Sequence, residues 1–295
     1  MNEALQSALS KRAIKMYDEI WDSFLDFLFD MSLSNALPVC EHKIALYLTN
    51  LYNCNYQSST ISSHLSVITY KHRLQGFPRS SDSFLLKQLL KGFRKHDRPR
   101  LPLKAIDKNL LNKIIVNISN SNDSVFKKTL FCTVFSALYH GALRSSEVSF
   151  NNDCDHTLRY GDIQVYDDCI DLTLNSYKHS KSESILRIKA SQDVSCFLSW
   201  YRKFSTTLAV VKNSSDYVFV SEDNSPIIRN QLATRLKQSI NDLGLNSDRY
   251  NTHSFRIGKA TDMYREGYSD RQIAEAGRWK SNAFLYYIRP KHVLM

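Results

Sequence analysis

"DIQVYDDCIDLTLNSYKHSKSESILRIKA", residues 162–190, decides the fold class of this chain. Aliphatic and β-branched residues alternate with polar ones in three short runs, which span residues 163–165, 170–174 and 185–188. A period of two residues is typical of half-buried strands. The polar stretch "NSYKHSKSES", residues 175–184, separates the last two runs and predicts the tip of a hairpin. We therefore predict a small antiparallel β-sheet within a chain that otherwise favours helices.

The region before this sheet shows a helical period. Apolar residues recur at spacings of three and four in residues 11–31, 40–52, 58–76, 81–96, 107–118 and 124–140. The basic stretch "RKHDRPRLPLKA", residues 94–105, carries two prolines and interrupts this period. We predict an all-α N-terminal domain of residues 1–98, a linker of residues 99–103 and a second domain of residues 104–295.

The region after the sheet returns to helices. Residues 192–204 are amphipathic, and a run of short helices then closes the chain. The start signals are Asn251 or Thr252, then Ser269, then Ser281 or Asn282, and the stop signals are Gly267, Gly277 and Pro290. The second domain is therefore predicted to be mainly α with a small antiparallel β-sheet, which is an α+β fold.

The composition favours a polyanionic partner and an intracellular location. The 39 Lys and Arg residues exceed the 29 Asp and Glu residues, which gives a formal net charge of +10. The six cysteines are widely spaced and lack metal-ligand spacing, so we expect free thiols in a reducing compartment. No apolar run approaches the ~18–20 residues of a membrane span, and no signal-peptide pattern begins the chain. A basic surface that is merely solvated remains an alternative.

The stretch "YHGALRSSEVSF", residues 139–150, places an arginine between two helices. Gly141 ends a long apolar helix and a new helix is expected at Ser145, so Arg144 lies at the junction. Glu147 follows one turn later and is placed to orient Arg144. The alternative is an ordinary surface Arg–Glu pair.

Two further stretches near the end of the chain carry candidate site residues. In "THSFRIGKA", residues 252–260, His253 and Arg256 share one helix face, and Gly258 allows close approach of another segment. The alternative is a buried histidine with a surface arginine. In "GRWKSNAFLYYIRP", residues 277–290, Trp279 offers an indole N–H that needs an acceptor if buried.

The same stretch ends in two adjacent tyrosines, Tyr286 and Tyr287. Neighbouring residues on a helix point about 100° apart. The two side chains therefore cannot share one role, and we expect one to pack while the other faces a cleft.

In this order the motifs resemble the tyrosine recombinase (phage integrase) family, and within it Cre-like or crypton-type mobile-element recombinases. The resemblance covers essentially the whole chain. It implies an all-α core-binding domain that contacts DNA, followed by an α+β catalytic domain. It also implies strand cleavage and rejoining through a covalent 3′-phosphotyrosyl intermediate, without metal, ATP or another cofactor.

The resemblance assigns a role to each matching residue. Arg144 and Arg256 would clamp the scissile phosphate, His253 and Trp279 would add hydrogen bonds, Lys178 would protonate the leaving 5′-oxygen, and Tyr287 would be the nucleophile. Lys181 is an alternative to Lys178. Tyr287 follows Trp279 by eight residues where the family more often has nine, and "YIR" favours it over Tyr286.

The implied partners are double-stranded DNA and further copies of the chain. Four protomers would assemble on two DNA sites, from a monomer or dimer off DNA. The candidate backbone contacts are Lys71, Arg73, Lys91, Arg94, Arg98 and Arg100. Such a protein works where its DNA is, in the nucleus of a eukaryote or otherwise in the cytoplasm, and not at a membrane.

Three other interpretations stay open. A type IB topoisomerase-like protein would share the chemistry but relax supercoils without pairing two sites. A catalytically inactive descendant would bind DNA only. The third is an unrelated basic helical protein in which the motifs occur by chance.

Overall fold

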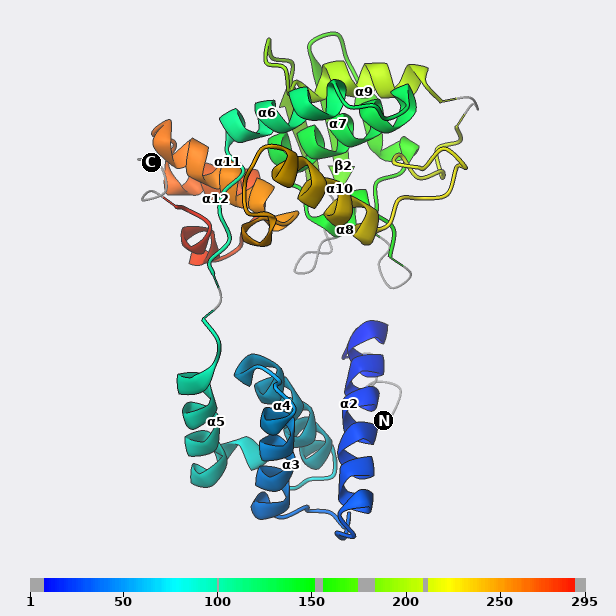
Figure 1. The fold of residues 1–295 in the computed structure, drawn as a ribbon. Helices are drawn as coiled ribbons and strands as arrows, with labels where there is room; N and C mark the ends of the chain where they lie inside the picture. The colour runs from blue at the N-terminus through cyan, green and yellow to red at the C-terminus, as the bar shows by residue number, and fades with distance from the viewer. Residues whose placement is uncertain (1–7, 100, 152–155, 175–183, 209–211, 290–295) are drawn as a thin grey trace. The chain divides into compact units, whose positions relative to one another are not determined.

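A computed structural model describes residues 8–99, 101–151, 156–174, 184–208 and 212–289 (Figure 1). The chain divides into two compact units, residues 1–100 and 101–295. Arg100, Lys178 and Lys181 lie outside the described residues, so their predicted roles remain predictions.

The first unit is built from helices. They are α2 (Lys11–Asp30), α3 (Glu41–Asn53), α4 (Ser58–Leu74), the 3₁₀ turn η1 (Ser80–Asp82) and α5 (Phe84–His96). Phe24, Ile44, Ile61 and Leu90 are among the apolar residues that meet in its core. The four helices expected before residue 98 are therefore all present, each with one buried apolar face.

The second unit surrounds helix α7. Its elements are α6 (Lys108–Ser119), α7 (Val125–His140), α8 (Ser145–Val148), η2 (Tyr160–Asp162), β1 (Ile163–Val165), β2 (Cys169–Leu174), β3 (Ser184–Lys189), α9 (Phe197–Thr206), α10 (Arg229–Asp242), η3 (Ser247–Arg249), α11 (His253–Arg265), α12 (Asp270–Gly277) and η4 (Asn282–Tyr286). Helix α7 is buried along most of its length and packs against α6, α9 and α11 (Figure 1). The packing of α7 therefore holds its last residue, His140, in place, and the turn that carries Arg144 follows directly after it.

The predicted sheet is confirmed. Strand β2 lies in the middle and pairs antiparallel with β1 and β3, so that Ile170 faces Ile188 across the ladder. The guanidinium of Arg187 forms two hydrogen bonds of 2.7 and 2.8 Å with the carboxylate of Asp171 on the neighbouring strand. The predicted hairpin tip falls within residues 175–183, which lie outside the described residues.

Three helical details differ from expectation. Helix α9 begins at Phe197 rather than near residue 192, because Asp193 forms an ion pair of 2.8 Å with Lys108 and the Ser195 carbonyl contacts His140 Nε2 at 2.9 Å. The last helix is a 3₁₀ helix that ends at Tyr286. Helix α10 was not predicted, because its buried apolar stripe is sparse among polar residues.

Gly258 allows a close approach, as predicted. The backbone of Ile106 runs beside α11 and donates from its N–H to the Ser254 carbonyl at 2.9 Å. A Cβ on Gly258 would lie 1.7 Å from the Ile106 carbonyl oxygen, which real side chains do not tolerate. The segment that enters the second unit is therefore fitted directly onto the helix that carries His253 and Arg256.

We expect Gly258→Ala to destabilise the second unit by about 1–3 kcal/mol, because the new methyl group forces the Ile106 backbone away. Gly92→Ala is the matched control. Gly92 lies within α5 with nothing near its Cβ position, so alanine there should stabilise the first unit by about 0.5–1 kcal/mol. Calorimetric unfolding measures both, and equal effects of the two substitutions would contradict the close fit.

Candidate active site

The turn after α7 positions Arg144. Ala142 takes a left-handed conformation with φ of 43°, and Arg144 then precedes the first residue of α8. The Glu147 carboxylate accepts from the Arg144 backbone N–H at 2.7 Å and from its Nη1 at 3.1 Å. The side chain of Glu147 is only 3% exposed and that of Arg144 is 28% exposed. The pair is therefore not an ordinary surface pair, and Glu147 orients Arg144 as predicted.

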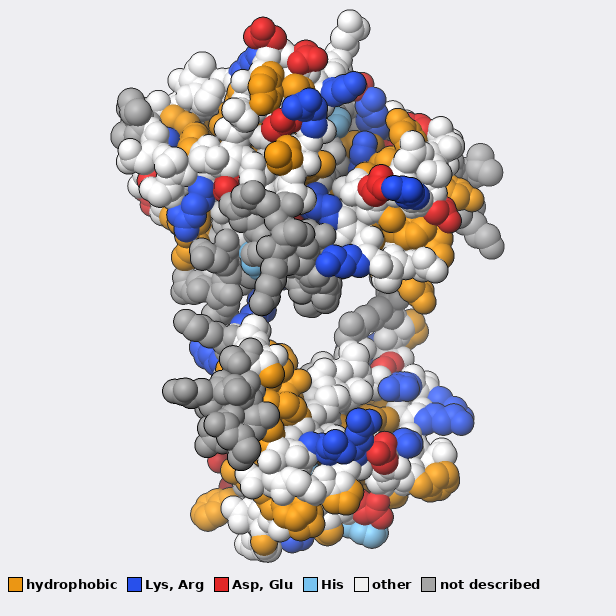
Figure 2. Space-filling model, turned by 180° about the vertical axis from the view of Figure 1, so that it is seen from behind, with side chains coloured by type: hydrophobic (Ala, Val, Ile, Leu, Met, Phe, Trp, Pro, Cys, Tyr) orange, Lys and Arg blue, Asp and Glu red, His pale blue; other side chains and the backbone are white. Residues whose placement is uncertain are grey.

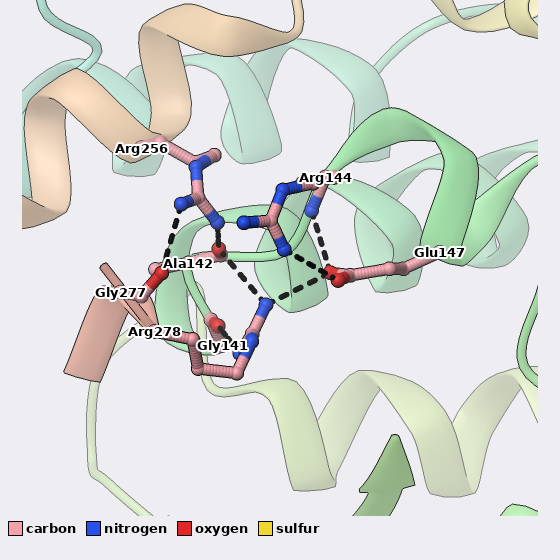
Figure 3. Close-up of polar contacts among 7 residues, drawn as sticks. All are labelled: Gly141, Ala142, Arg144, Glu147, Arg256, Gly277 and Arg278. Atoms are coloured by element: carbon pink, nitrogen blue, oxygen red, sulfur yellow. Dashed lines mark hydrogen bonds and ion pairs between the residues drawn. The ribbon is translucent and has the colours of Figure 1, made fainter. Parts of the chain in front are cut away.

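Helix α11 supplies His253 at its first residue and Arg256 one turn later. Arg256 is 1% exposed, whereas His253 keeps substantial exposed surface, which is the reverse of the ordinary alternative. The Arg256 guanidinium donates to the Gly277 carbonyl at 2.8 Å and to the Ala142 carbonyl (Figure 3). Arg256 thus ties α11 to the turn after α7 and to the end of α12.

Trp279 and Tyr287 complete the cluster with aromatic rings. The Tyr287 ring centroid lies 4.7 Å from the His253 ring and 4.7 Å from the Trp279 ring. The Arg256 guanidinium carbon lies 4.8 Å from the Trp279 centroid and 5.8 Å from that of Tyr287. Gly277 makes this packing possible, because a Cβ there would lie 1.8 Å from the Trp279 ring.

We expected one of the two tyrosines to pack and the other to face a cleft, and the packing half of this expectation is wrong for Tyr286. Tyr286 is 80% exposed and does not pack, whereas Tyr287 is the ring held beside His253 and Trp279. The reason is the 3₁₀ turn, in which the Tyr287 N–H bonds the Phe284 carbonyl at 2.9 Å. The geometry therefore brings Tyr287 to the arginine cluster.

The cluster contains buried donors that find no acceptor among the described residues, and Nε1 of Trp279 and Nε of Arg256 are among them. An unsatisfied buried N–H costs free energy, and such groups in native proteins call for an explanation. An anion with several acceptor oxygens offers the kind of acceptor that these donors lack.

The electrostatics of the cluster favour an anion. Burial first, and then the charges of Arg144 and Arg278, lower the pKa of Arg256 to about 10. Desolvation first, and then Arg256 and other arginines, lower the pKa of His253 to about 4, although the residue as a whole keeps exposed surface. His253 is therefore neutral near pH 7 and can accept a hydrogen bond or a proton.

Arg278 is a site residue that sequence reasoning missed. Its guanidinium bonds Glu147 Oε2 at 2.8 Å and the Gly141 carbonyl at 3.1 Å (Figure 3). The available signal was an arginine directly after Gly277, where the helix ends, but no pattern indicated that its side chain would turn inward.

The depressed pKa of His253 predicts a loss of stability in acid. An unfolded histidine titrates near pH 6.5, so below that pH the unfolded chain takes up a proton that folded His253 binds only near pH 4. The free energy of unfolding should therefore fall as the pH drops from 6.5 to 4, and it should fall less steeply in His253→Gln. His140, whose pKa burial also lowers to about 4, and His64, whose pKa burial lowers as well, would maintain part of the slope in that variant. Thermal unfolding of both proteins across this pH range measures the effect. Equal pH dependence of the wild type and His253→Gln would refute the lowered pKa of His253.

The structure brings together Arg144, His253, Arg256, Trp279 and Tyr287 of the predicted catalytic set. Among the predicted DNA contacts, Arg73, Lys91, Arg94 and Arg98 are exposed in the first unit. Lys71 forms an ion pair of 2.7 Å with Asp18, which reduces its availability. Figure 2 shows Lys and Arg side chains on the surface of both units.

Residues 104–289 match the sequence model of the phage integrase family. The chain belongs to this family. Among its relatives, the recombinase Cre of Escherichia phage P1 is 24% identical over 272 residues, which cover 82% of this chain and 74% of Cre.

Solved structures of recombinases and integrases share the fold of this chain. XerH bound to a palindromic difH substrate has a TM-score of 0.66 at 16% identity, covering 93% of this chain and 75% of XerH. A λ integrase dimer bound to a COC′ core site has a TM-score of 0.62 at 12% identity, covering 99% and 76%. The Tn1549 transposon integrase in complex with circular intermediate DNA reaches 0.65 at 10% identity, covering 95% and 90%.

Metal and membrane signals are lacking within the described ranges. No group of three or more His, Cys, Asp and Glu side chains in them is placed to hold a metal ion. Their helices are also too short or too polar for any of them to span a membrane.

Proposed function

We propose that this integrase-family chain is a site-specific DNA recombinase that cuts and rejoins strands through a covalent 3′-phosphotyrosyl intermediate. The observation that carries the proposal is the cluster itself. Arg144, Arg256, Trp279 and Tyr287 come from four separate segments, and the cluster contains unsatisfied buried donors beside a phenol ring.

Arg144 and Arg256 would bind the non-bridging oxygens of the scissile phosphate. A phosphodiester is anionic and repels nucleophiles, and its negative charge on those oxygens grows in the pentacoordinate transition state. Fixed guanidinium groups stabilise that charge without reorganising. The Nε1–H of Trp279 supplies a further donor that is already desolvated.

Tyr287 would attack the phosphorus. A phenol has a pKa of about 10, so its proton must leave as the new P–O bond forms. Neutral His253, whose ring lies 4.7 Å from the Tyr287 ring, is a candidate to receive it. The bond from phosphorus to the 5′-oxygen breaks, and Lys178, or alternatively Lys181, would protonate that oxygen. The phosphotyrosyl bond conserves the energy needed for rejoining.

The first unit would supply sequence-independent contacts to the DNA backbone through its exposed basic residues. Recombination would require four protomers on two DNA sites inside the cell that holds the target. A type IB topoisomerase-like activity is the rival with the same chemistry. An inactive DNA-binding descendant is disfavoured because the five described catalytic candidates are all present and clustered.

The test is covalent capture. Full-length protein is incubated in EDTA with a suicide DNA carrying the terminal sequences of its own element, and the products are separated in denaturing detergent. A protein–DNA adduct without metal or ATP is expected. An adduct that never forms would refute the proposal, and relaxation of plasmids of any sequence would favour the topoisomerase.

A further inference from the structure

Arg278 lies within the cluster, yet the chemistry proposed above gives it no role. It follows α12 directly, and its φ of 55° is a left-handed conformation that favours glycine. Its side chain is only 6% exposed, so its charge has been removed from water. A strained backbone and a desolvated charge persist only where the surroundings enforce them, and such residues concentrate at functional sites.

One contact of Arg278 reaches the carboxylate that orients Arg144. Arg278 Nη2 lies 2.8 Å from Glu147 Oε2, and Arg144 Nη1 lies 3.1 Å from Glu147 Oε1. The side chain of Glu147 is 3% exposed, so the two guanidinium groups share one buried carboxylate, each through a different oxygen. Arg278 therefore limits where the Glu147 carboxylate, and with it the Arg144 side chain, can lie.

The other contacts reach the turn that holds Arg256. Arg278 donates to the Gly141 carbonyl at 3.1 Å, and its Nη2 lies 3.4 Å from the Ala142 carbonyl. The same Ala142 carbonyl accepts from Arg256 Nη1 (Figure 3). Ala142 is itself left-handed, so hydrogen bonds from two arginines hold a turn that alanine does not favour.

We infer that Arg278 is a positioning residue for strand cleavage. It bridges Glu147 and the turn at residues 141–142, and it thereby directs the guanidinium groups of Arg144 and Arg256 toward one phosphate. This inference rests on the recombinase function proposed above. The planar guanidinium fork serves a carboxylate and two carbonyls at once, which the single ammonium of a lysine cannot reproduce.

The test compares two suicide DNAs in single-turnover cleavage by the full-length protein. One carries the ordinary scissile phosphodiester, and the other carries a methylphosphonate there, which has no negative charge. Arg278→Gly keeps the left-handed backbone without strain but removes the bridge. We expect cleavage of the phosphodiester to slow about 10²-fold, because the clamping groups are misdirected. The loss on the methylphosphonate should be much smaller, because no charge remains to be neutralised.

Two matched variants serve as controls. One keeps the positive charge at residue 278 but not the bridge, and the other removes an exposed arginine of the same helix. Arg278→Lys keeps the charge but loses the bridge, so it should cleave the phosphodiester DNA as slowly as Arg278→Gly. Arg271→Ala removes an arginine of α12 that is 88% exposed and should cleave like the wild type. Each of three results would overturn the inference. Arg278→Gly could cleave at the wild-type rate, it could lose the same factor on both DNAs, or Arg278→Lys could keep full activity. A wild-type protein that forms no adduct would instead refute the proposed function.

Discussion

Tyr287→Phe should form no covalent adduct with DNA, whereas Tyr286→Phe should form it at a rate close to that of the wild type. The expectation follows from position. The Tyr287 ring lies 4.7 Å from both His253 and Trp279 and beside the Arg256 guanidinium, whereas Tyr286 is 80% exposed. Removing one oxygen from Tyr287 removes the only atom that would bond to phosphorus, so the loss should be complete rather than partial.

The measurement is adduct formation on a suicide DNA, with DNA binding followed in parallel. Tyr287→Phe should still bind DNA, because the arginines and the first unit are unchanged. The Tyr286→Phe variant is the matched control, since it removes the same atom one residue away. Loss of the adduct only in Tyr286→Phe would reverse the assignment, and loss in neither variant would remove both tyrosines from the chemistry.

The sequence predicted the fold where local signals were strong. The alternation in residues 162–190 predicted the three strands, and Ser269 and Gly277 bounded α12 closely. Where it failed, tertiary contacts or weak patterns were responsible. The ion pair of Asp193 with Lys108 delays the start of α9, and no single-sequence pattern reports a partner 85 residues away.

The sequence predicted which residues form the site, but it predicted less well how their side chains are buried and directed. Motif order indicated Arg144, His253, Arg256, Trp279 and Tyr287, and the structure clusters them. The burial of Arg256 depends on carbonyls of two other segments, which sequence spacing cannot show. The inward turn of Arg278 depends likewise on Glu147, which lies 131 residues earlier in the chain.

Arg256→Met should lower single-turnover cleavage by about 10²–10³-fold, the loss typical when one fixed donor to a developing oxyanion is removed. Methionine keeps much of the side-chain bulk but removes the charge and all donors. Its effect on folding should be moderate, because two opposed terms compete. The carbonyls of Ala142 and Gly277 lose a donor, but the burial cost and the repulsion that lower the pKa of Arg256 to about 10 disappear.

Arg235→Met is the control that separates lost activity from lost stability. Arg235 is also a buried arginine, 6% exposed, but it lies on α10 and pairs with Asp123 at 2.8 Å. Its replacement should lower the melting temperature and leave the cleavage rate of the folded protein unchanged. If both arginine variants cleaved equally slowly after correction for the folded fraction, general weakening of the second unit would explain the loss. If Arg256→Met cleaved at the wild-type rate, the buried guanidinium beside the Tyr287 ring would not act on the phosphate.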